Sequence, residues 1–245
     1  MPVRIGAIAV GGKGSRFGHS YLQKCLVPIE GKPILEYTID AFVDCGIKII
    51  FFLTGFLHEQ ISTYLTQRYG TEAKFVPAIV FGGTTGIAPA LFTLRHFVDE
   101  DFMFACGDSI LKHNAFSQLL QQAQKLPDSL AVMLISRNIE AAPTHAFVRI
   151  DTSTSTVRTV RLTKPARRPS AQDLVDTGTY YFRPAAFDFL GKVKPNQQLA
   201  NFIRPLKRTG QTVSAVVIGE PWFCLHAPDD LQRWELVKAT LRPGS

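Results

Sequence analysis

The chain has 245 residues, of which 46% are hydrophobic and 19% are charged. This balance is typical of a globular protein and excludes a disordered chain. The net charge is +7, but the basic residues are dispersed, and the two clusters at 164–168 and 204–208 lack the interleaved aromatics of a nucleic-acid platform. We therefore expect no nucleic-acid partner, and a basic balance also suits polyanionic small molecules.

The cysteines and the apolar runs indicate the compartment. Four cysteines lie far apart, at positions 25, 45, 106 and 224, which argues against a disulfide framework or a structural zinc site and favours a reducing compartment. The longest apolar stretch, residues 49–53, is too short to cross a bilayer. We expect a soluble, cytoplasmic protein without membrane contact.

Strand and helix patterns alternate through the first half of the chain. Apolar runs predict strands at 5–10, 48–54, 74–81 and 102–106, and apolar residues at helical spacing predict helices at 34–45, 58–69 and 88–97. This rhythm predicts a parallel sheet with crossover helices.

The second half of the chain is less regular. It predicts strands at 131–136, 147–151, 157–162, 175–182 and 213–218, with a Ser/Thr-rich turn at 152–156. No repeat or low-complexity linker divides the sequence. We predict one α/β domain over residues 1–245, Rossmann-like, with three α/β/α layers and a mixed, mostly parallel central sheet.

A glycine turn follows the first strand. Residues 11–16 read Gly-Gly-Lys-Gly-Ser-Arg, and Lys24 comes eight residues after Arg16. Glycines let backbone N–H groups approach an anion closely, and the cations then neutralise its charge. The order of residues does not match a Walker loop, and Phe17 stands where a dinucleotide fingerprint needs glycine or alanine. The turn therefore predicts a binding site for a nucleoside triphosphate.

Residues 11–16, 23–28 and 32–35 together resemble the N-terminal signature of the nucleotidylyltransferases that activate sugar phosphates. That signature is Gly-Gly-x-Gly-Thr-Arg followed by Pro-Lys-x-Leu-x-Pro, and here Ser15 replaces the threonine and Gln23 replaces the proline. The resemblance implies the nucleotide-diphospho-sugar transferase fold, with a nucleotide-binding half at about 1–130 and an acceptor-binding half at about 131–245. The nucleotide-binding residues that we expect are Ala9, Gly11, Gly12, Gly14, Ser15 and Gly86.

Asp108 is the next candidate. It follows the strand at 102–106, so its carboxylate is expected at the edge of the sheet where α/β proteins bind ligands. The resemblance implies that Asp108 binds Mg²⁺, whereas the alternative is that it caps a helix that begins near Lys112. Gly86 similarly resembles part of a loop beneath the nucleobase or belongs to a plain glycine-rich turn. Phe81 stands where relatives that take thymidine or uridine nucleotides carry glutamine, so the base stays open.

The acceptor residues depart from the family pattern. Lys164 matches the lysine that holds the acceptor phosphate, but Thr163 replaces the preceding glutamate. Asp176 replaces the asparagine of the Asn-Thr-Gly-x-Tyr strand, in which Gly178 is kept, and Ala146 replaces a glycine. These residues predict an altered acceptor pocket.

The largest departure lies in residues 222–231, which resemble Trp-x-Asp-Ile-Gly-Thr-Pro-Glu-Asp-Leu. The family's first aspartate there is the second Mg²⁺ ligand, and Cys224 stands in its place. A thiol is a poor ligand for this cation. Asp229 and Asp230 either begin a helix or replace the missing ligand. His226 would share a strand face with Cys224, although a lone histidine is seldom a ligand.

The resemblance implies an enzyme that transfers an NMP from an NTP to a phosphorylated acceptor, a sugar 1-phosphate or a cyclitol phosphate, and releases pyrophosphate with Mg²⁺ as cofactor. Arg16, Lys24 and Asp108 are the expected catalytic residues. The alternatives are a nucleotide-binding regulatory or scaffold protein without turnover, and the same chemistry on phosphocholine or a phosphonate. A homo-oligomer stays open.

Overall fold

The structure is a computed structural model that describes residues 2–14, 16, 21–70, 74–112, 114–138, 145–151, 156–162, 170, 172–219 and 221–241, with the backbone alone at 156–162 and 207. Nine strands of this part form the central sheet: β1 (Ile5–Ala9), β4 (Ile49–Thr54), β5 (Val76–Phe81), β6 (Phe102–Cys106), β8 (Ser129–Ser136), β9 (Ala146–Asp151), β10 (Thr156–Leu162), β11 (Leu174–Phe182) and β12 (Thr212–Ile218). The helices are α1 (Ile34–Asp44), α2 (His58–Tyr69), α3 (Ile87–Phe92), α4 (Asn114–Lys125), α5 (Phe187–Leu190) and α6 (Asp230–Leu241).

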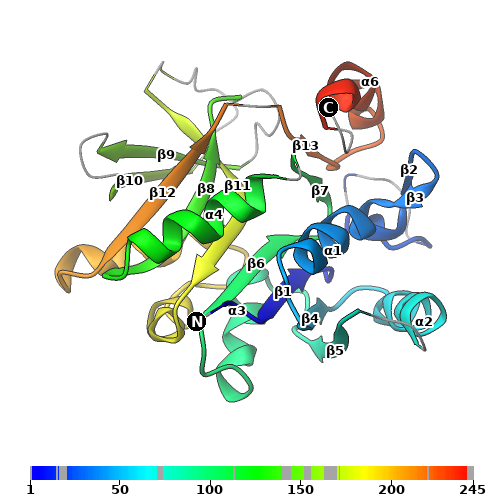
Figure 1. The fold of residues 1–245 in the computed structure, drawn as a ribbon, viewed down its shortest axis with the longest axis horizontal. Coiled ribbons are helices and arrows are strands. Elements are labelled where there is room, and N and C mark those ends of the chain that lie inside the picture. Colours follow the sequence, from blue (N-terminus) through cyan, green and yellow to red (C-terminus); the bar gives the residue numbers. More distant parts are fainter. Residues whose placement is uncertain are drawn as a thin grey trace.

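The sheet is mixed, in the order β5-β4-β1-β6-β11-β8-β12-β10-β9 (Figure 1). Strands β5, β4, β1 and β6 are parallel, as the alternating pattern of the first half predicts. Strand β11 is antiparallel to both of its neighbours β6 and β8, whereas β12 runs parallel to β8. The predicted α/β fold class is therefore confirmed, and β11 carries the second half of the chain into the middle of the sheet.

Helices cover both faces of the sheet and give it two cores. On β6, Phe102 and Phe104 point into one core and Met103 into the other, as the period of two in a strand requires. Helices α1 and α4 cover the Met103 face, where the rings of Phe42 and Phe116 lie 5.6 Å apart. Helices α3 and α5 cover the opposite face. The three predicted layers follow from this arrangement.

The short elements differ most from the sequence prediction. The predicted helix at 88–97 is α3 followed by a 3-10 turn, η3 (Thr93–His96). Further helical turns, η5 (Pro184–Ala186), η6 (Leu199–Ile203) and η7 (Pro205–Arg208), were not predicted, because segments this short carry no measurable periodicity. Among the described helices, none combines the length and apolarity that crossing a membrane would need. All four cysteines are unpaired.

Gly178 allows β11 to pack against β6. Its φ is +76°, and a Cβ there would lie 2.8 Å from Cys106 Sγ. We expect Gly178→Ala to lower the free energy of unfolding by about 2–4 kcal/mol, from left-handed strain and overpacking together. Gly210→Ala is the control, since its φ is +71° but no atom lies within 4 Å of the new Cβ, and it should cost about 1 kcal/mol. Urea unfolding measures both, and equal losses would contradict the packing argument.

Candidate functional site

The glycine turn after β1 lies against the end of β4. Val10 N–H donates to Leu53 O at 3.0 Å, and Phe56 N–H donates to Gly11 O at 3.1 Å. A Cβ on Gly11 would come within 2.9 Å of the Thr54 backbone, so this close approach requires glycine. The turn is thereby fixed at the carboxyl edge of the parallel strands, where α/β proteins bind ligands.

A pocket at this edge contains four of the residues predicted to bind the nucleotide, namely Ala9, Gly11, Gly12 and Gly86. Its other lining residues come from the end of β4 and the β5–α3 segment: Leu53, Gly83, Thr84, Ile87 and Ala90. Gly86 has φ +126°, a conformation that favours glycine. Gly14 is near the same turn in sequence, with φ +57°, whereas Ser15 falls outside the described residues.

Gln23 ties the predicted lysine to the turn. Its buried side chain donates to Val10 O at 2.6 Å and accepts from Cys25 N–H at 2.8 Å. It thereby caps a short 3-10 turn, η2 (Lys24–Leu26). The departure from the family's proline at this position thus supplies the bonds that hold Lys24 near β1.

Lys24 and Asp108 form an ion pair across 84 residues of sequence. Burial is the largest single influence on Lys24 and opposes its charge, but the Asp108 carboxylate, together with smaller contributions from Cys224 and Cys25, raises the pKa of Lys24 overall. Burial likewise opposes ionisation of Asp108, yet Lys24 and then His226 lower its pKa. Both groups are therefore charged near neutral pH. The Asp108 carboxylate contacts Lys24, and β7 (Ser109–Ile110) separates it from α4, which favours a role other than a helix cap.

Cys224 lies beside Asp108 because two short strands pair. Strand β13 (Phe223–Cys224) is antiparallel to β7, with Cys224 opposite Ser109. Cys224 Sγ lies 3.9 Å from Asp108 Oδ1 and accepts a hydrogen bond from Ser109 Oγ at 3.3 Å. Asp230 begins α6 and accepts from His226 N–H at 2.6 Å, and Asp229 is exposed. The interpretation of this acidic pair as a helix start is the one that fits.

Two histidines complete the cluster around the thiol. His226 Nε2 lies 3.5 Å from Cys224 Sγ, and His145 Nε2 lies 3.0 Å from His226 Nε2. His145 Nδ1 donates to the backbone carbonyl of Asp176 at 2.7 Å. The sequence pattern indicates Cys224 and His226 but not His145, which carries no motif and stands just before β9.

The Mg²⁺ site that the resemblance implies requires a second carboxylate. Among the described residues, the side chains near the Asp108 carboxylate that could bind a metal are one thiol, two imidazoles and the Ser109 hydroxyl. Mg²⁺ prefers oxygen ligands, whereas sulfur and imidazole suit softer cations. The residues that the structure describes around Asp108 therefore do not fit a two-carboxylate Mg²⁺ site.

Of the predicted acceptor residues, Asp176 and Gly178 are described. The Asp176 carboxylate accepts from Gly178 N–H at 2.8 Å and from Tyr180 Oη at 2.5 Å, and burial raises its pKa. Both carboxylate oxygens are thus bonded within β11 itself. Thr163 and Lys164 lie outside the described residues, and Ala146 is buried at the start of β9.

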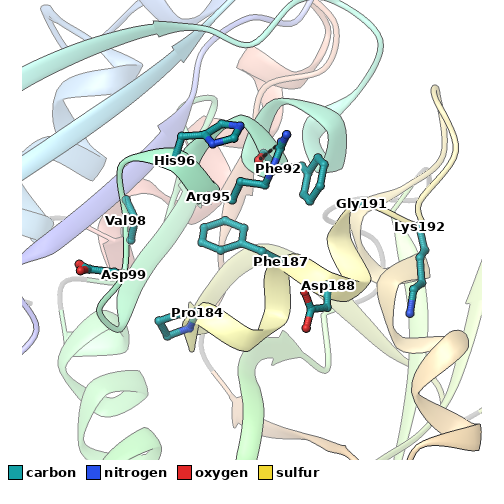
Figure 2. A pocket seen from close by; sticks show the side chains of 10 residues that line it. All are labelled: Phe92, Arg95, His96, Val98, Asp99, Pro184, Phe187, Asp188, Gly191 and Lys192. Atoms are coloured by element: carbon teal, nitrogen blue, oxygen red, sulfur yellow. Dashed lines mark hydrogen bonds between the residues drawn. The ribbon is translucent and has the colours of Figure 1, made fainter.

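A second pocket lies away from these residues. It opens between η3 and α5, where the Arg95 guanidinium lies 4.0 Å from the centroid of the Phe92 ring (Figure 2). Phe187, Asp188 and Lys192 line its other side. It contains none of the residues that the sequence singles out, so the strand-end site remains the candidate.

A glycine-lined pocket and a buried Lys–Asp pair at the carboxyl edge of parallel strands are typical of an α/β protein that binds a ligand at this edge. The family model described as "Nucleotidyl transferase" matches residues 5–218. The chain is 30% identical over 214 residues to the UTP--glucose-1-phosphate uridylyltransferase AglF of Haloferax volcanii, covering 84% of both chains. The chain therefore belongs to the nucleotidyl transferase family and is a nucleotidyltransferase.

Solved structures agree on the fold. A UDP-glucose pyrophosphorylase complexed with UDP-glucose superposes with a TM-score of 0.82 at 16% identity, covering 98% of this chain and 100% of that one. The inositol-1-phosphate CTP transferase of T. maritima gives 0.77 at 16% identity, over 100% and 98%. Other curated relatives are longer, and the chain spans 63% and 62% of the length of two of them.

The Lys24–Asp108 pair should stabilise the fold measurably. Its side chains are 13% and 20% exposed, so we expect Lys24→Met to lower the free energy of unfolding by about 1–3 kcal/mol, because it leaves a buried carboxylate without its cation. Asp108→Asn in the same chain should recover part of that loss. The exposed pair Lys32–Asp40, at 32% and 52%, is the control, and Lys32→Met should cost under about 1 kcal/mol. Urea unfolding measures both variants, and equal losses of unfolding free energy for Lys24→Met and Lys32→Met would contradict a stabilising role for the buried pair.

Proposed function

We propose that this nucleotidyltransferase moves an NMP from an NTP onto a small acceptor that already carries a phosphate, a sugar 1-phosphate or a cyclitol phosphate. The observation that carries the proposal is the Lys24–Asp108 pair. Its chain neighbours Gln23 and Gly107 donate hydrogen bonds to the backbone carbonyls of Gly12 and Ala9, which line the glycine pocket. An acceptor phosphate oxygen forms the new bond to the α-phosphorus, and the bond from that phosphorus to the departing pyrophosphate breaks. No covalent bond to the protein is needed.

Each residue at the carboxyl edge of the parallel strands has its own role in this transfer. Backbone N–H groups of the glycine turn face the triphosphate, and Arg16, which is exposed, offsets charge on the pyrophosphate as it leaves. Lys24, held by Asp108, binds the α-phosphate and brings the two anionic substrates together. Lys164 is the proposed ligand of the acceptor phosphate, and Thr163 and Asp176 give that half of the chain its altered pocket. Residues 1–130 and 131–245 then serve nucleotide and acceptor respectively.

The donors around Asp108 bear on which cation the reaction uses. Sugar nucleotidyltransferases are generally dependent on a divalent metal, but the donors around Asp108 do not fit the pair of carboxylates expected for Mg²⁺. We therefore assign no step to Mg²⁺. The four unpaired cysteines support the proposed location in a reducing compartment such as the cytoplasm.

The second candidate function is a nucleotide-binding protein of the same family that has lost turnover. The replacement of an expected metal ligand by Cys224 favours it, whereas the charged Lys24–Asp108 pair favours the enzyme. The four nucleoside triphosphates should be tested against a panel of phosphorylated acceptors that includes sugar 1-phosphates, cyclitol phosphates, phosphocholine and a phosphonate. Pyrophosphate release supports the enzyme, whereas thermal stabilisation by a triphosphate without release supports the binding protein.

Gly12 offers a test of the triphosphate position. A Cβ on Gly12 would meet no atom within 4 Å, so Gly12→Ala should leave the free energy of unfolding within about 0.5 kcal/mol of the parent. The new methyl would lie in the pocket that we assign to the phosphates, and we expect nucleotide affinity to fall on the order of tenfold or more. Gly219→Ala, which is equally free of contacts, should change neither quantity. Unaltered nucleotide affinity in Gly12→Ala, measured by calorimetry, would place the phosphates elsewhere.

Arg16 tests the chemistry without a large effect on folding. Because this side chain is exposed, Arg16→Ala should keep the melting temperature while turnover falls on the order of a hundredfold, as loss of one electrostatic stabiliser often does. Arg204→Ala, also at an exposed site, should turn over like the parent. Pyrophosphate release is the readout, and equal rates for the two variants would remove Arg16 from the mechanism.

A further inference from the structure

One cluster of metal-binding side chains remains outside the proposed mechanism. His145, Cys224 and His226 offer three ligand atoms that all lie within 4.8 Å of one another. They come from three places in the fold: the segment before β9, strand β13, and the residues that precede α6. The cluster is next to the Lys24–Asp108 pair, because Cys224 Sγ lies 3.9 Å from Asp108 Oδ1.

The spacing of the three atoms matches a tetrahedral metal site. Zn²⁺ bonds of about 2.0–2.1 Å to nitrogen and about 2.3 Å to sulfur imply edges of about 3.3 Å between two nitrogens and about 3.6 Å between nitrogen and sulfur. The observed edges are 3.0 Å for the two Nε2 atoms, and 3.5 and 3.9 Å from Cys224 Sγ to the Nε2 atoms of His226 and His145. A cation therefore fits between them with small shifts.

The groups that contact His145 and Cys224 also favour a metal site. His145 donates its Nδ1–H to the Asp176 carbonyl at 2.7 Å, which leaves the Nε2 lone pair directed at the cluster. Metal-bound histidines commonly donate their other ring N–H to a carbonyl in this manner. The Ser109 hydroxyl orients Cys224 Sγ by a hydrogen bond of 3.3 Å, and the Asp108 carboxylate, 3.9 Å from the same sulfur, adds a negative charge that would attract a cation.

We propose that His145, Cys224 and His226 form a Zn²⁺ site with three protein ligands, beside the Lys24–Asp108 pair. The mixed nitrogen and sulfur donors select Zn²⁺ over Mg²⁺, which prefers oxygen. Three protein ligands leave the fourth tetrahedral position to water or to a substrate oxygen, as in catalytic rather than structural zinc sites. Such an ion supplies Lewis acidity toward a phosphoryl oxygen. This chemical role rests on the proposed function, whereas the binding of Zn²⁺ does not.

Metal binding is tested first, on the full chain stripped of metal with a chelator and kept reduced. Titration against a chromophoric zinc indicator should show one equivalent of tightly held Zn²⁺. Co²⁺ in its place should show the intense visible bands of a tetrahedral ion and a thiolate-to-metal charge-transfer band in the near ultraviolet. Failure to take up one equivalent would overturn the site, and so would a Co²⁺ spectrum without the charge-transfer band.

Variants assign the ligands. Cys224→Ser is close to isosteric and should remove the charge-transfer band, and Cys224→Ser, His145→Gln and His226→Gln should each weaken Zn²⁺ at least 10–100-fold, the range seen when only an outer partner of a ligand is lost. The controls are Cys45→Ser and His58→Asn, at a free cysteine and a half-exposed histidine outside the cluster. Circular dichroism checks the fold of each variant. Zn²⁺ affinity that is unchanged in Cys224→Ser and His145→Gln would mean that the two imidazoles simply hydrogen-bond to each other, and would overturn the site.

A substitution at residue 224 also tests which metal the site prefers. Cys224→Asp restores the oxygen ligand of the family pattern, so it should lose Zn²⁺ affinity at least tenfold and gain pyrophosphate release with Mg²⁺ relative to Zn²⁺. Zn²⁺ binding without turnover by the parent would overturn the proposed function and leave the metal site standing. Turnover with Mg²⁺ by a parent that takes up no Zn²⁺ would overturn the metal site and leave the function.

Discussion

The ion pair between Lys24 and Asp108 is the interaction on which the site depends. It joins the η2 turn to the end of β6 across 84 residues of sequence, and it keeps both groups charged in a place where burial alone would neutralise them. Gln23 holds the same turn against β1. The glycine turn, the cation and the carboxylate are thereby fixed relative to one another before any ligand arrives, which lowers the cost of binding a polyanion.

The two-residue pairing of β7 with β13 decides what surrounds that carboxylate. It sets Cys224 opposite Ser109, so the thiol lies where the family pattern has a carboxylate. A single substitution at such a position changes the donor chemistry of the site without changing the backbone. His145 and His226 form with this thiol a set of nitrogen and sulfur ligands, which differs from the oxygen ligands that a hard cation prefers.

Much of this arrangement could be predicted from the sequence. Local periodicity predicts the parallel strands and the crossover helices. Because parallel strands end at one edge of the sheet, the glycine turn and Asp108 are expected at the same edge. The place of β11 could not, because its antiparallel pairing with β6 joins Tyr180 to Phe104, far apart in sequence. The same holds for His145, whose approach to His226 spans 81 residues and depends on two loops that no local pattern encodes.

The insertion of β11 between β6 and β8 also limits how the protein can move. In many two-lobed enzymes a hinge opens and closes the cleft between lobes, but here a continuous ladder of backbone hydrogen bonds joins β6 to β8 through β11. Parting them would sever that ladder and expose Tyr180 and Phe182, which are fully buried. The strand order therefore argues against a hinge that separates β6 from β8.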